Sequence, residues 1–175
     1  MHPLQSFRYC PVCGSEHFIE NNFKSKRCES CGFVYYFNSS AATAIFITNR
    51  VGELLVVRRA NEPAKGTFDL PGGFVDLYET AEEAIMREVK EETGLQISNP
   101  DYLFSLPNIY RYSGFDVHTV DLFYQYSVET FSGVQAGDDA ESLLFLERIF
   151  LRLPVSCRFR QPFSGILFLY RPRWL

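Results

Sequence analysis

The sequence lacks the features of a membrane or exported protein. No apolar run reaches the ~18 residues that a transmembrane helix needs, and residues 1–9 contain no apolar signal-peptide core. A strong charge of one sign is also missing, because 17 Lys and Arg face 21 Asp and Glu for a net charge of −4. This balance gives no general attraction to nucleic acid or anionic lipid. With 46% hydrophobic residues, the chain is typical of a soluble globular protein, and we expect a cytoplasmic one without a membrane partner.

The first 37 residues have few aliphatic side chains from which to build a core. They do contain four of the five cysteines of the chain, in two Cys-x-x-Cys pairs that are each followed by glycine: Cys10, Cys13, Cys28 and Cys31. This spacing is typical of a structural zinc site with four thiolate ligands, whose binding energy would fold the segment. Two disulfides are the alternative, but they need an oxidising compartment that nothing in the sequence indicates. We expect a zinc ribbon over residues 1–37.

A small basic and aromatic patch lies at the second pair of cysteines of this segment. It consists of Phe23, Lys24, Lys26 and Arg27. The patch is typical either of a nucleic-acid contact or of a solvated hairpin turn, and the turn is the simpler interpretation. Nucleic acid therefore stays an alternative partner through the ribbon. The fifth cysteine, Cys157, is expected to be a buried thiol rather than a ligand.

From residue 38 onward the pattern is that of a mixed α/β domain, which we expect to end at residue 147. Short runs rich in β-formers predict strands at 42–48, 54–59, 102–106, 119–128 and 143–146. Residues Thr80 to Thr93 predict a helix, with Thr80 and Glu83 in capping-box positions and Gly94 as its end. Strands on both sides of one strong helix indicate the α/β class.

The tail after residue 147 differs in composition from the rest. Residues 148–175 contain six arginines and neither acid nor lysine, and three prolines interrupt them. A long amphipathic helix does not form easily in such a segment. The apolar stretch at 163–170 is compatible with an added strand or a partner surface, and an altered terminus is a further alternative. We leave the structure of this tail open.

The predicted helix carries a group of acidic residues on one side. Glu88, Glu91 and Glu92 share an arc of about 100° next to the apolar stripe of the helix. Acidic runs on helices are more often surface charge than a binding site. Three carboxylates that converge beside a core nevertheless suit Mg²⁺ or Mn²⁺, which prefer oxygen ligands from protein, water and phosphate.

The residues before and along this helix match a longer pattern. It runs from Gly73 through Glu79 to Arg87-Glu88-Val89-Lys90-Glu91-Glu92 and ends at Gly94-Leu95. This pattern resembles a complete Nudix box, and the chain is similar to the Nudix hydrolase family over about residues 39–147. Together with the ribbon in front, it resembles the zinc-containing NADH pyrophosphatase branch. The resemblance implies a Nudix α/β/α sandwich with a mixed sheet.

The resemblance also implies roles for single residues. Glu88, Glu91 and Glu92 correspond to the metal-binding glutamates, and Arg87 and Glu79 to the residues that orient them and support the loop. Gly73 corresponds to the position where the backbone comes close to metal and phosphates. Many members add an acidic ligand or general base from a later loop. We expect Glu141 in that role, with Asp138 and Asp139 as rivals.

The family chemistry is hydrolysis of a nucleoside diphosphate linked to another group, by attack of water on phosphorus with divalent metal ions. The resemblance implies NADH, ADP-ribose and FAD-like dinucleotides as the favoured substrates of this chain. The NADH pyrophosphatase branch carries an array after the box that appears here only in part, as Ser105-Leu-Pro-Asn-Ile-Tyr-Arg-Tyr-Ser113. Tyr110 and Tyr112 in this array are candidates for stacking on a base, or are ordinary strand residues.

Two classes of function remain open from the sequence. The first is a Nudix pyrophosphohydrolase whose ribbon is structural or forms a homodimer, as family members often do. The second is a regulator that senses a nucleotide or binds RNA ends through the ribbon and the Nudix domain. All box glutamates are present, which favours the hydrolase.

Overall fold

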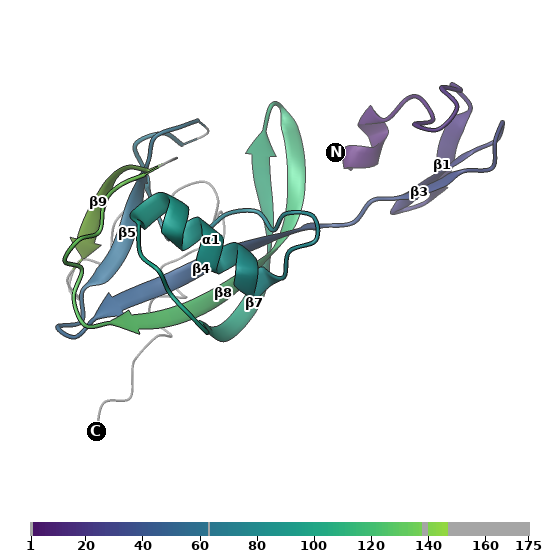
Figure 1. The fold of residues 1–175 in the computed structure, drawn as a ribbon. Coiled ribbons are helices and arrows are strands. Elements are labelled where there is room, and N and C mark those ends of the chain that lie inside the picture. Colours follow the sequence, from purple (N-terminus) through teal and green to yellow (C-terminus); the bar gives the residue numbers. More distant parts are fainter. Residues whose placement is uncertain (1, 63, 138–139, 147–175) are drawn as a thin grey trace.

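The computed structural model describes residues 2–62, 64–137 and 140–146, and these form two parts joined by an extended segment (Figure 1). The first part contains the cysteine pairs, and the second is a sheet covered by one helix. The boundary expected between residues 37 and 38 falls between the last strand of the first part and the first strand of the second. The tail 148–175 with Cys157, and the rival acids Asp138 and Asp139, lie outside the described residues.

The N-terminal part is a small antiparallel sheet in the order β1-β2-β3. Its elements are the 3-10 helix η1 (Pro3–Ser6) and the strands β1 (Phe18–Asn22), β2 (Ser25–Cys28) and β3 (Val34–Tyr36). Its buried core consists of Cys10, Phe18 and Cys28, with Phe7, Phe33 and Tyr35 packed against them. Aromatic rings and sulfurs therefore take the place of the missing aliphatic side chains.

The second part is built on a mixed six-stranded sheet. Its strands lie in the order β6-β5-β4-β8-β7, and β9 also pairs with β5. The bounds are β4 (Ser40–Asn49), β5 (Leu54–Arg59), β6 (Phe68–Asp69), α1 (Ala81–Thr93), β7 (Asp101–Tyr112), β8 (Phe115–Val128) and β9 (Ala140–Leu146). The central pair β4 and β8 is parallel, whereas the other pairs are antiparallel.

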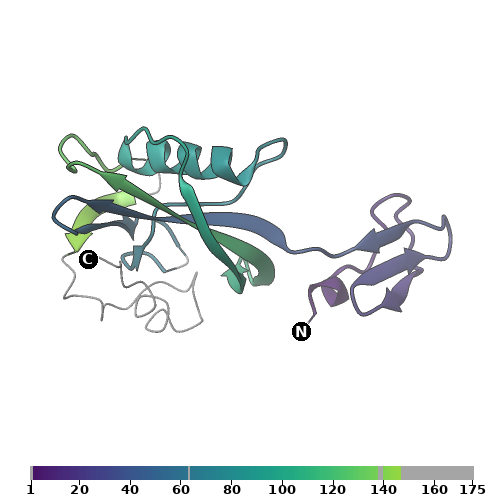
Figure 2. The same cartoon turned by 90° about the horizontal axis from the view of Figure 1, so that it is seen from below.

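Apolar side chains on both faces of the central strand build two cores. Ile45 and Ile47 of β4 pack with Ile85 and Val89 of α1, so the helix covers one face of the sheet (Figure 2). Their neighbours in β4 point the other way and pack against Phe123, Val56 and Leu70. The mixed α/β fold expected from the sequence is confirmed. No helix within the described residues is long and apolar enough to cross a membrane.

The sheet opens between β4 and β5, and the segment 71–75 fills the opening. The two strands pair only at Ile47–Leu55 and Thr48–Leu54. Beyond that point, β4 pairs instead with the backbone of 71–75, because its amides at Thr43 and Ile45 donate to the carbonyls of Gly73 and Pro71, at 2.8 and 3.0 Å. The glycine segment is therefore held at a strand edge directly below α1.

The helix has the ends that its sequence predicts. The side chain of Thr80 accepts from the backbone N–H of Glu83, while the Glu83 carboxylate accepts from the N–H of Thr80. Gly94 ends the helix at φ 73°, in the left-handed region that glycine tolerates best. Strand β7, in contrast, continues to Tyr112 and is longer than predicted. It tolerates Pro107 because it lies at the edge of the sheet.

Loss of the N-terminal cap should weaken the whole domain, since α1 covers one core. We expect Thr80→Ala to lower the free energy of unfolding by about 1 kcal/mol, the usual cost of losing a cap. Urea unfolding at neutral pH measures the difference, and Thr80→Ser serves as the control because its hydroxyl can still accept. Equal stability of the alanine and serine variants would contradict this role of the cap.

Candidate active site

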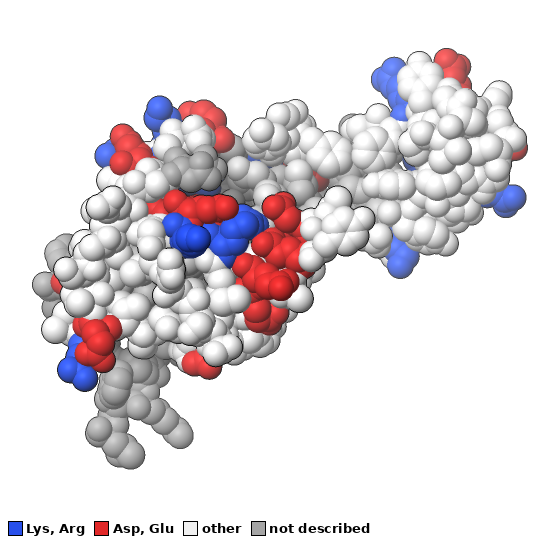
Figure 3. Space-filling model, in the orientation of Figure 1, with Lys and Arg blue, Asp and Glu red and all other residues white. Residues whose placement is uncertain are grey.

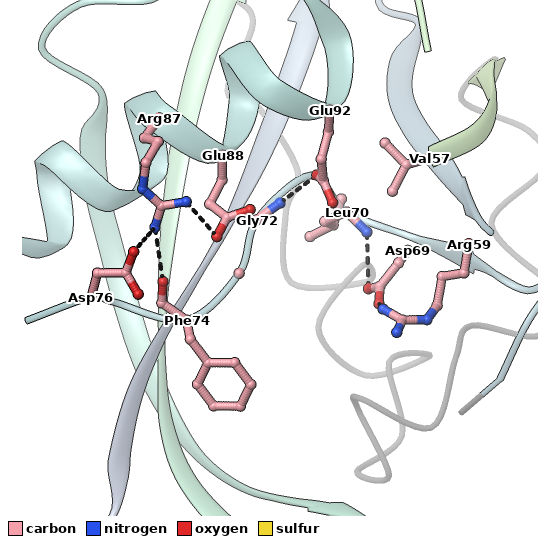
Figure 4. A pocket seen from close by; sticks show the side chains of 11 residues that line it. Val57, Arg59, Asp69, Leu70, Gly72, Phe74, Asp76, Arg87, Glu88 and Glu92 are labelled. Atoms are coloured by element: carbon pink, nitrogen blue, oxygen red, sulfur yellow. Dashed lines mark hydrogen bonds and ion pairs between the residues drawn. The ribbon is translucent and has the colours of Figure 1, made fainter. Parts of the chain in front are cut away.

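A cavity of about 180 Å³ lies where the helix, the glycine segment and the end of β5 meet (Figure 4). It is lined by Val57, Arg59, Asp69, Leu70, Gly72, Gly73, Phe74, Asp76, Arg87, Glu88 and Glu92. Arg87 lies at one end and Arg59 at the other, with Glu88 and Glu92 between them. Three segments within residues 57–92 thus supply one polar, concave surface.

Arg87 connects the helix to the segment before it through nearly every donor it has. Its Nε and Nη2 donate to the two carboxylate oxygens of Glu79, at 2.8 and 3.1 Å. Nη2 also donates to the carbonyl of Phe74 at 3.1 Å. Nη1 donates to the carboxylates of Glu88 and Glu91, each at 3.0 Å. The Glu79 carboxylate in turn accepts from the N–H of Asp76. The guanidinium fork therefore sets the relative positions of loop and glutamates.

These contacts shift the ionisation of both partners. Hydrogen bonds from Arg87 lower the pKa of Glu79 below its usual value, against a smaller opposing effect of burial. The same bonds to Glu79, followed by those to Glu88 and Glu91, raise the pKa of Arg87. The Glu79 carboxylate therefore stays charged to lower pH than usual, and the Arg87 guanidinium stays charged to higher pH.

Gly73 lies against the carboxylate of Glu88. A Cβ at this position would come within 2.0 Å of Glu88 Oε1, so any side chain would displace the carboxylate from the cavity. The Gly73 carbonyl accepts from the N–H of Thr43. Glycine at this position therefore lets the Glu88 carboxylate stay in the cavity.

Glu92 is held by the neighbouring glycine. Its side chain is buried, and Oε2 accepts from the N–H of Gly72 at 2.9 Å. Gly72 has φ +144°, and a Cβ would lie 2.2 Å from the carbonyl oxygen of Thr43. Gly72 can therefore bring its N–H to Glu92 only because it has no side chain.

The opposite end of the cavity carries a second cation. Arg59 forms an ion pair with Asp69 at 3.6 Å, and their side chains are 16% and 1% exposed. Arg59 Nη2 also donates to the hydroxyl of Tyr110 at 3.5 Å. A carboxylate and a phenol therefore hold this guanidinium at the cavity wall.

Negative charge outweighs positive charge in the lining. Four acidic residues, Asp69, Asp76, Glu88 and Glu92, face two arginines, and Glu91 lies next to them on α1 with its side chain 43% exposed. Figure 3 shows acidic side chains gathered over α1 and the segment before it, with basic ones between them. An excess of hard oxygen ligands in a hollow suits a divalent cation such as Mg²⁺.

The remaining residues predicted for the site lie at different distances from the cavity. Tyr110 is buried beside it, where its ring contacts that of Phe74 at a centroid distance of 6.1 Å. Tyr112 stacks on Tyr110 and is 55% exposed. Glu141 does not line the cavity; its carboxylate, 46% exposed, pairs with Arg58 at 3.5 Å.

Three residues of the cavity lining have no recognisable pattern in the sequence. Arg59, Asp69 and Phe74 all line the cavity, yet they belong to a strand end, a two-residue strand and a loop. The position of Arg59 at the end of a predicted strand beside the glycine segment is the one signal that points to it. The pairing of β5 with β6 brings Arg59 and Asp69 together, and no local pattern encodes that pairing.

The four cysteines of the ribbon form a second candidate metal centre. Their sulfurs all lie within 4.8 Å of one another, and they are the one such cluster of potential ligands in the described part of the chain. Two pairs, Cys10–Cys31 and Cys13–Cys28, are 3.7 and 3.6 Å apart. A tetrahedral ion with bonds of about 2.3 Å separates its sulfurs by about 3.8 Å, whereas a disulfide needs about 2.05 Å. The geometry is that of a metal site.

The cysteine loops have matching backbone geometry. In each, the glycine after the second cysteine donates its N–H to the carbonyl of the first at 2.9 Å, from Gly14 to Cys10 and from Gly32 to Cys28. Both glycines have positive φ. Burial opposes ionisation of Cys28, but bonds from the backbone of Cys31 and Ser30 and from the nearby thiols outweigh it, so its pKa falls to about 6.

Comparison with known proteins identifies the family. The family model described as NUDIX domain matches residues 38–154, more than half of the 175-residue chain. The chain belongs to the NUDIX family. The resemblance indicated by the Nudix box is thereby confirmed, and the matched range contains the whole cavity.

Two relatives illustrate what this NUDIX chain is similar to. A protein of Vibrio vulnificus named NAD-capped RNA hydrolase NudC is 30% identical over 106 residues, which are 61% of this chain and 40% of that protein. An ADP-ribose pyrophosphatase of Methanocaldococcus jannaschii is 37% identical over 102 residues, 58% of either chain. The chain therefore spans about two fifths of the NudC protein and three fifths of the other.

Solved structures agree with the NUDIX fold. A NUDIX hydrolase from Nitrosomonas europaea aligns with a TM-score of 0.61 at 18% identity, over 80% of this chain and 77% of that one. The MutT protein of Methanosarcina mazei also aligns with a TM-score of 0.61, at 23% identity, over 75% and 94% of the two chains. At these identities the likeness shows the fold alone.

The pair of Arg87 and Glu79 should contribute stability in a pH-dependent way. Because the folded pKa of Glu79 is lowered, its contribution is complete above the unfolded pKa and disappears as pH falls through the folded value. We expect Glu79→Gln to cost about 1 kcal/mol at pH 7, and the difference from wild type to vanish in acid. Urea unfolding of both proteins from pH 7 down into the acid range measures this difference in the free energy of unfolding.

The control for this experiment is Glu129→Gln, which removes an exposed ion pair with Arg50. Exposed pairs contribute little, so the control should match wild type within about 0.5 kcal/mol at every pH. A cost of Glu79→Gln that stays constant from neutral to acid pH would show that the ion pair is not its source.

Proposed function

We propose that the cavity hydrolyses the diphosphate of a nucleoside diphosphate linked to a second group, with a divalent metal ion. The proposal is based on the placement of charged groups in the cavity: Glu88 and Glu92 lie on the helix side, and Arg59 lies at the far end. An anionic diphosphate needs positive charge nearby. The guanidinium of Arg59 and a metal ion bound by the carboxylates would supply it. The names of the NudC and ADP-ribose pyrophosphatase relatives support this class of substrate.

Glu88 and Glu92 would hold the metal, together with the more exposed Glu91. Their carboxylates are the hard ligands that Mg²⁺ and Mn²⁺ prefer, and the excess of acids in the cavity lining fits a cation. When bound, such an ion supplies charge neutralisation to the phosphates and lowers the pKa of water. The backbone of Gly73 is close enough to Glu88 to contribute a carbonyl, although that oxygen already accepts from Thr43.

We assign the general base to Glu92. A water oxygen attacks one phosphorus, its proton passes to the Glu92 carboxylate, and the anhydride P–O bond breaks with its electron pair leaving on the second phosphate. Two phosphate monoesters result. Glu92 lines the cavity and is oriented by Gly72, whereas Glu141 pairs with Arg58 away from the lining. Asp69 and Phe74 act indirectly. Asp69 holds Arg59 in place, and the carbonyl of Phe74 holds Arg87.

The substrate would extend along the cavity toward the tyrosines. Arg59 would bind a phosphate oxygen, since Asp69 and Tyr110 already orient its guanidinium. Because the ring of Tyr110 packs between Phe74 and Tyr112, the exposed ring of Tyr112 is the better candidate to stack on a base. NADH, ADP-ribose and FAD share the linked diphosphate that this arrangement fits.

A nucleotide at the end of an RNA is the second candidate substrate. The name of the NudC relatives favours it. The ribbon patch offers less support, because Lys26 donates to the carbonyl of Phe7 and lies over the ring of Phe18. A nucleotide sensor without turnover stays the alternative from another class, and we regard a homodimer as a proposal for either.

We propose that zinc occupies the four-cysteine centre. Four sulfurs at tetrahedral spacing are the ligand set of structural zinc, and the buried sulfurs of Cys10 and Cys28 are part of the ribbon core. Ion binding would therefore stabilise the ribbon itself. The metal would have no contact with the reacting phosphates.

The proposed chemistry predicts a sharp effect of Glu92→Gln. We expect kcat/KM to fall at least about 100-fold, because the change removes a metal ligand and the base at once. The measurement is release of phosphate monoesters from NADH, NAD⁺, ADP-ribose, FAD and 5′-NAD RNA with Mg²⁺ or Mn²⁺. The matched control is Glu129→Gln, an exposed glutamate paired with Arg50, which should retain wild-type rates. Near-normal turnover by Glu92→Gln would refute the assignment.

The cation at the far end predicts an effect on substrate binding. Arg59→Lys keeps a charge beside Asp69 but loses the planar fork, so we expect kcat/KM to fall about 10- to 100-fold, mainly through KM. Arg58→Lys is the matched control, because Arg58 contacts Gly66 and Glu141 outside the lining. Melting temperatures monitor folding. Equal kinetics of the two variants would show that Arg59 does not bind substrate.

A further inference from the structure

The ribbon and the NUDIX domain meet at a cluster of aromatic rings. Phe7 and Phe37 come from the N-terminal part, and Phe115 and His118 from the start of β8. Phe115 lies 6.1 Å from Phe7 and 6.5 Å from Phe37, and His118 lies 5.9 Å from Phe37, between ring centroids. Both views place the turn between β7 and β8 next to η1 (Figures 1 and 2). We call these four residues the ribbon contact.

The turn that receives this contact has no strand pairing with the central strand of the sheet. Pairing of β8 with the central strand β4 begins at Thr119. In the described part of the chain, residues 109–118 therefore pair with one another alone, as the end of a two-stranded hairpin. Such a hairpin is marginally stable by itself and depends on packing against something else. Within the described residues, the ribbon contact supplies such packing at the turn, and the contact of Tyr110 with Phe74 supplies it at the cavity end.

On the ribbon side, the position of Phe7 in the contact depends on packing against the cysteine centre. Phe7 packs against the core made by Cys10, Phe18 and Cys28, and its ring meets that of Tyr35 at 5.8 Å. The carbonyl of Phe7 also accepts from the ammonium of Lys26. Whatever orders the cysteines therefore orders the ring that touches the hairpin.

On the other side, the same hairpin ends at the cavity. Phe115 pairs with Tyr112 across the turn, and Val117 pairs with Tyr110. Tyr110 contacts Phe74, which lines the cavity, and its hydroxyl accepts from Arg59. A shift of the hairpin would thus move the aromatic wall and loosen the hold on a cavity arginine.

We propose that the ribbon is a positioning element for the substrate: through the ribbon contact it holds hairpin 109–118, and hence Tyr110 and Tyr112, in place beside the cavity. This inference rests on the proposed function for its kinetic consequence. Phe115 and Phe37 are positioning residues, because they reach the substrate only through the tyrosines. Ordering of the four cysteines by their metal is a precondition for the contact.

The test is Phe115→Ala, read by hydrogen exchange and by kinetics with ADP-ribose. We expect the backbone amides at 109–118 to exchange about 3- to 10-fold faster, because the aromatic pairs of Phe115 are lost. KM should rise by a factor of the same order while kcat stays within about twofold, since the carboxylates are untouched. Phe115→Leu keeps apolar bulk and should lie between alanine and wild type.

Phe23→Ala is the matched control, because Phe23 is a ribbon aromatic that is 78% exposed and takes no part in the contact. It should leave exchange and kinetics unchanged. Metal removal by a chelator, followed by return of Mg²⁺, should reproduce the effect of Phe115→Ala on exchange at 109–118. The same treatment should add little in the Phe115→Ala variant, because both changes break one contact.

Exchange needs no substrate, so the two proposals can fail separately. Unchanged exchange at 109–118 in Phe115→Ala, or full additivity with metal removal, would overturn the positioning role whatever the chain hydrolyses. Faster exchange in a protein that turns over no nucleotide would support the mechanical contact and contradict the proposed function instead.

Discussion

The guanidinium of Arg87 is the interaction on which the site depends. It joins the carboxylate of Glu79 and the carbonyl of Phe74 in the loop to Glu88 and Glu91 on the helix. A lysine could not replace it, because a single ammonium lacks the planar fork that reaches two oxygens of one carboxylate and a third acceptor at once. The glutamates would otherwise repel one another on one face of a helix, and this cation makes their proximity tolerable.

A second constraint is the opening of the sheet between β4 and β5. It allows the glycine segment to pair with β4, which satisfies backbone groups that a buried strand edge would leave unpaired. The two glycines of this segment are crowded by different neighbours. Gly72 lies against the backbone of Thr43, and Gly73 lies against the carboxylate of Glu88. Two adjacent glycines are needed because two different neighbours occupy the space where side chains would stand.

The arrangement of the two parts gives the ribbon a structural reason to be there. Its core is too small to be stable on apolar packing, and its sulfurs are at the spacing of a metal site. The outer end of the β7–β8 hairpin extends past the sheet and meets rings of the ribbon. The contact thus adds apolar packing both to the small ribbon core and to the end of the hairpin.

Local patterns in the sequence determined the helix with its cap, most strands, the cysteine loops and the identity of the helical glutamates. These features depend on neighbours within a few turns of chain, such as Thr80 with Glu83 or Gly94 after Thr93. Only the tertiary structure decided that Arg59 and Asp69 close the cavity, that Glu141 faces Arg58, and that Phe115 meets Phe37. Those contacts arise from strand pairing and from the packing of two parts, which bring different segments of the chain together and leave no periodic signal in either segment.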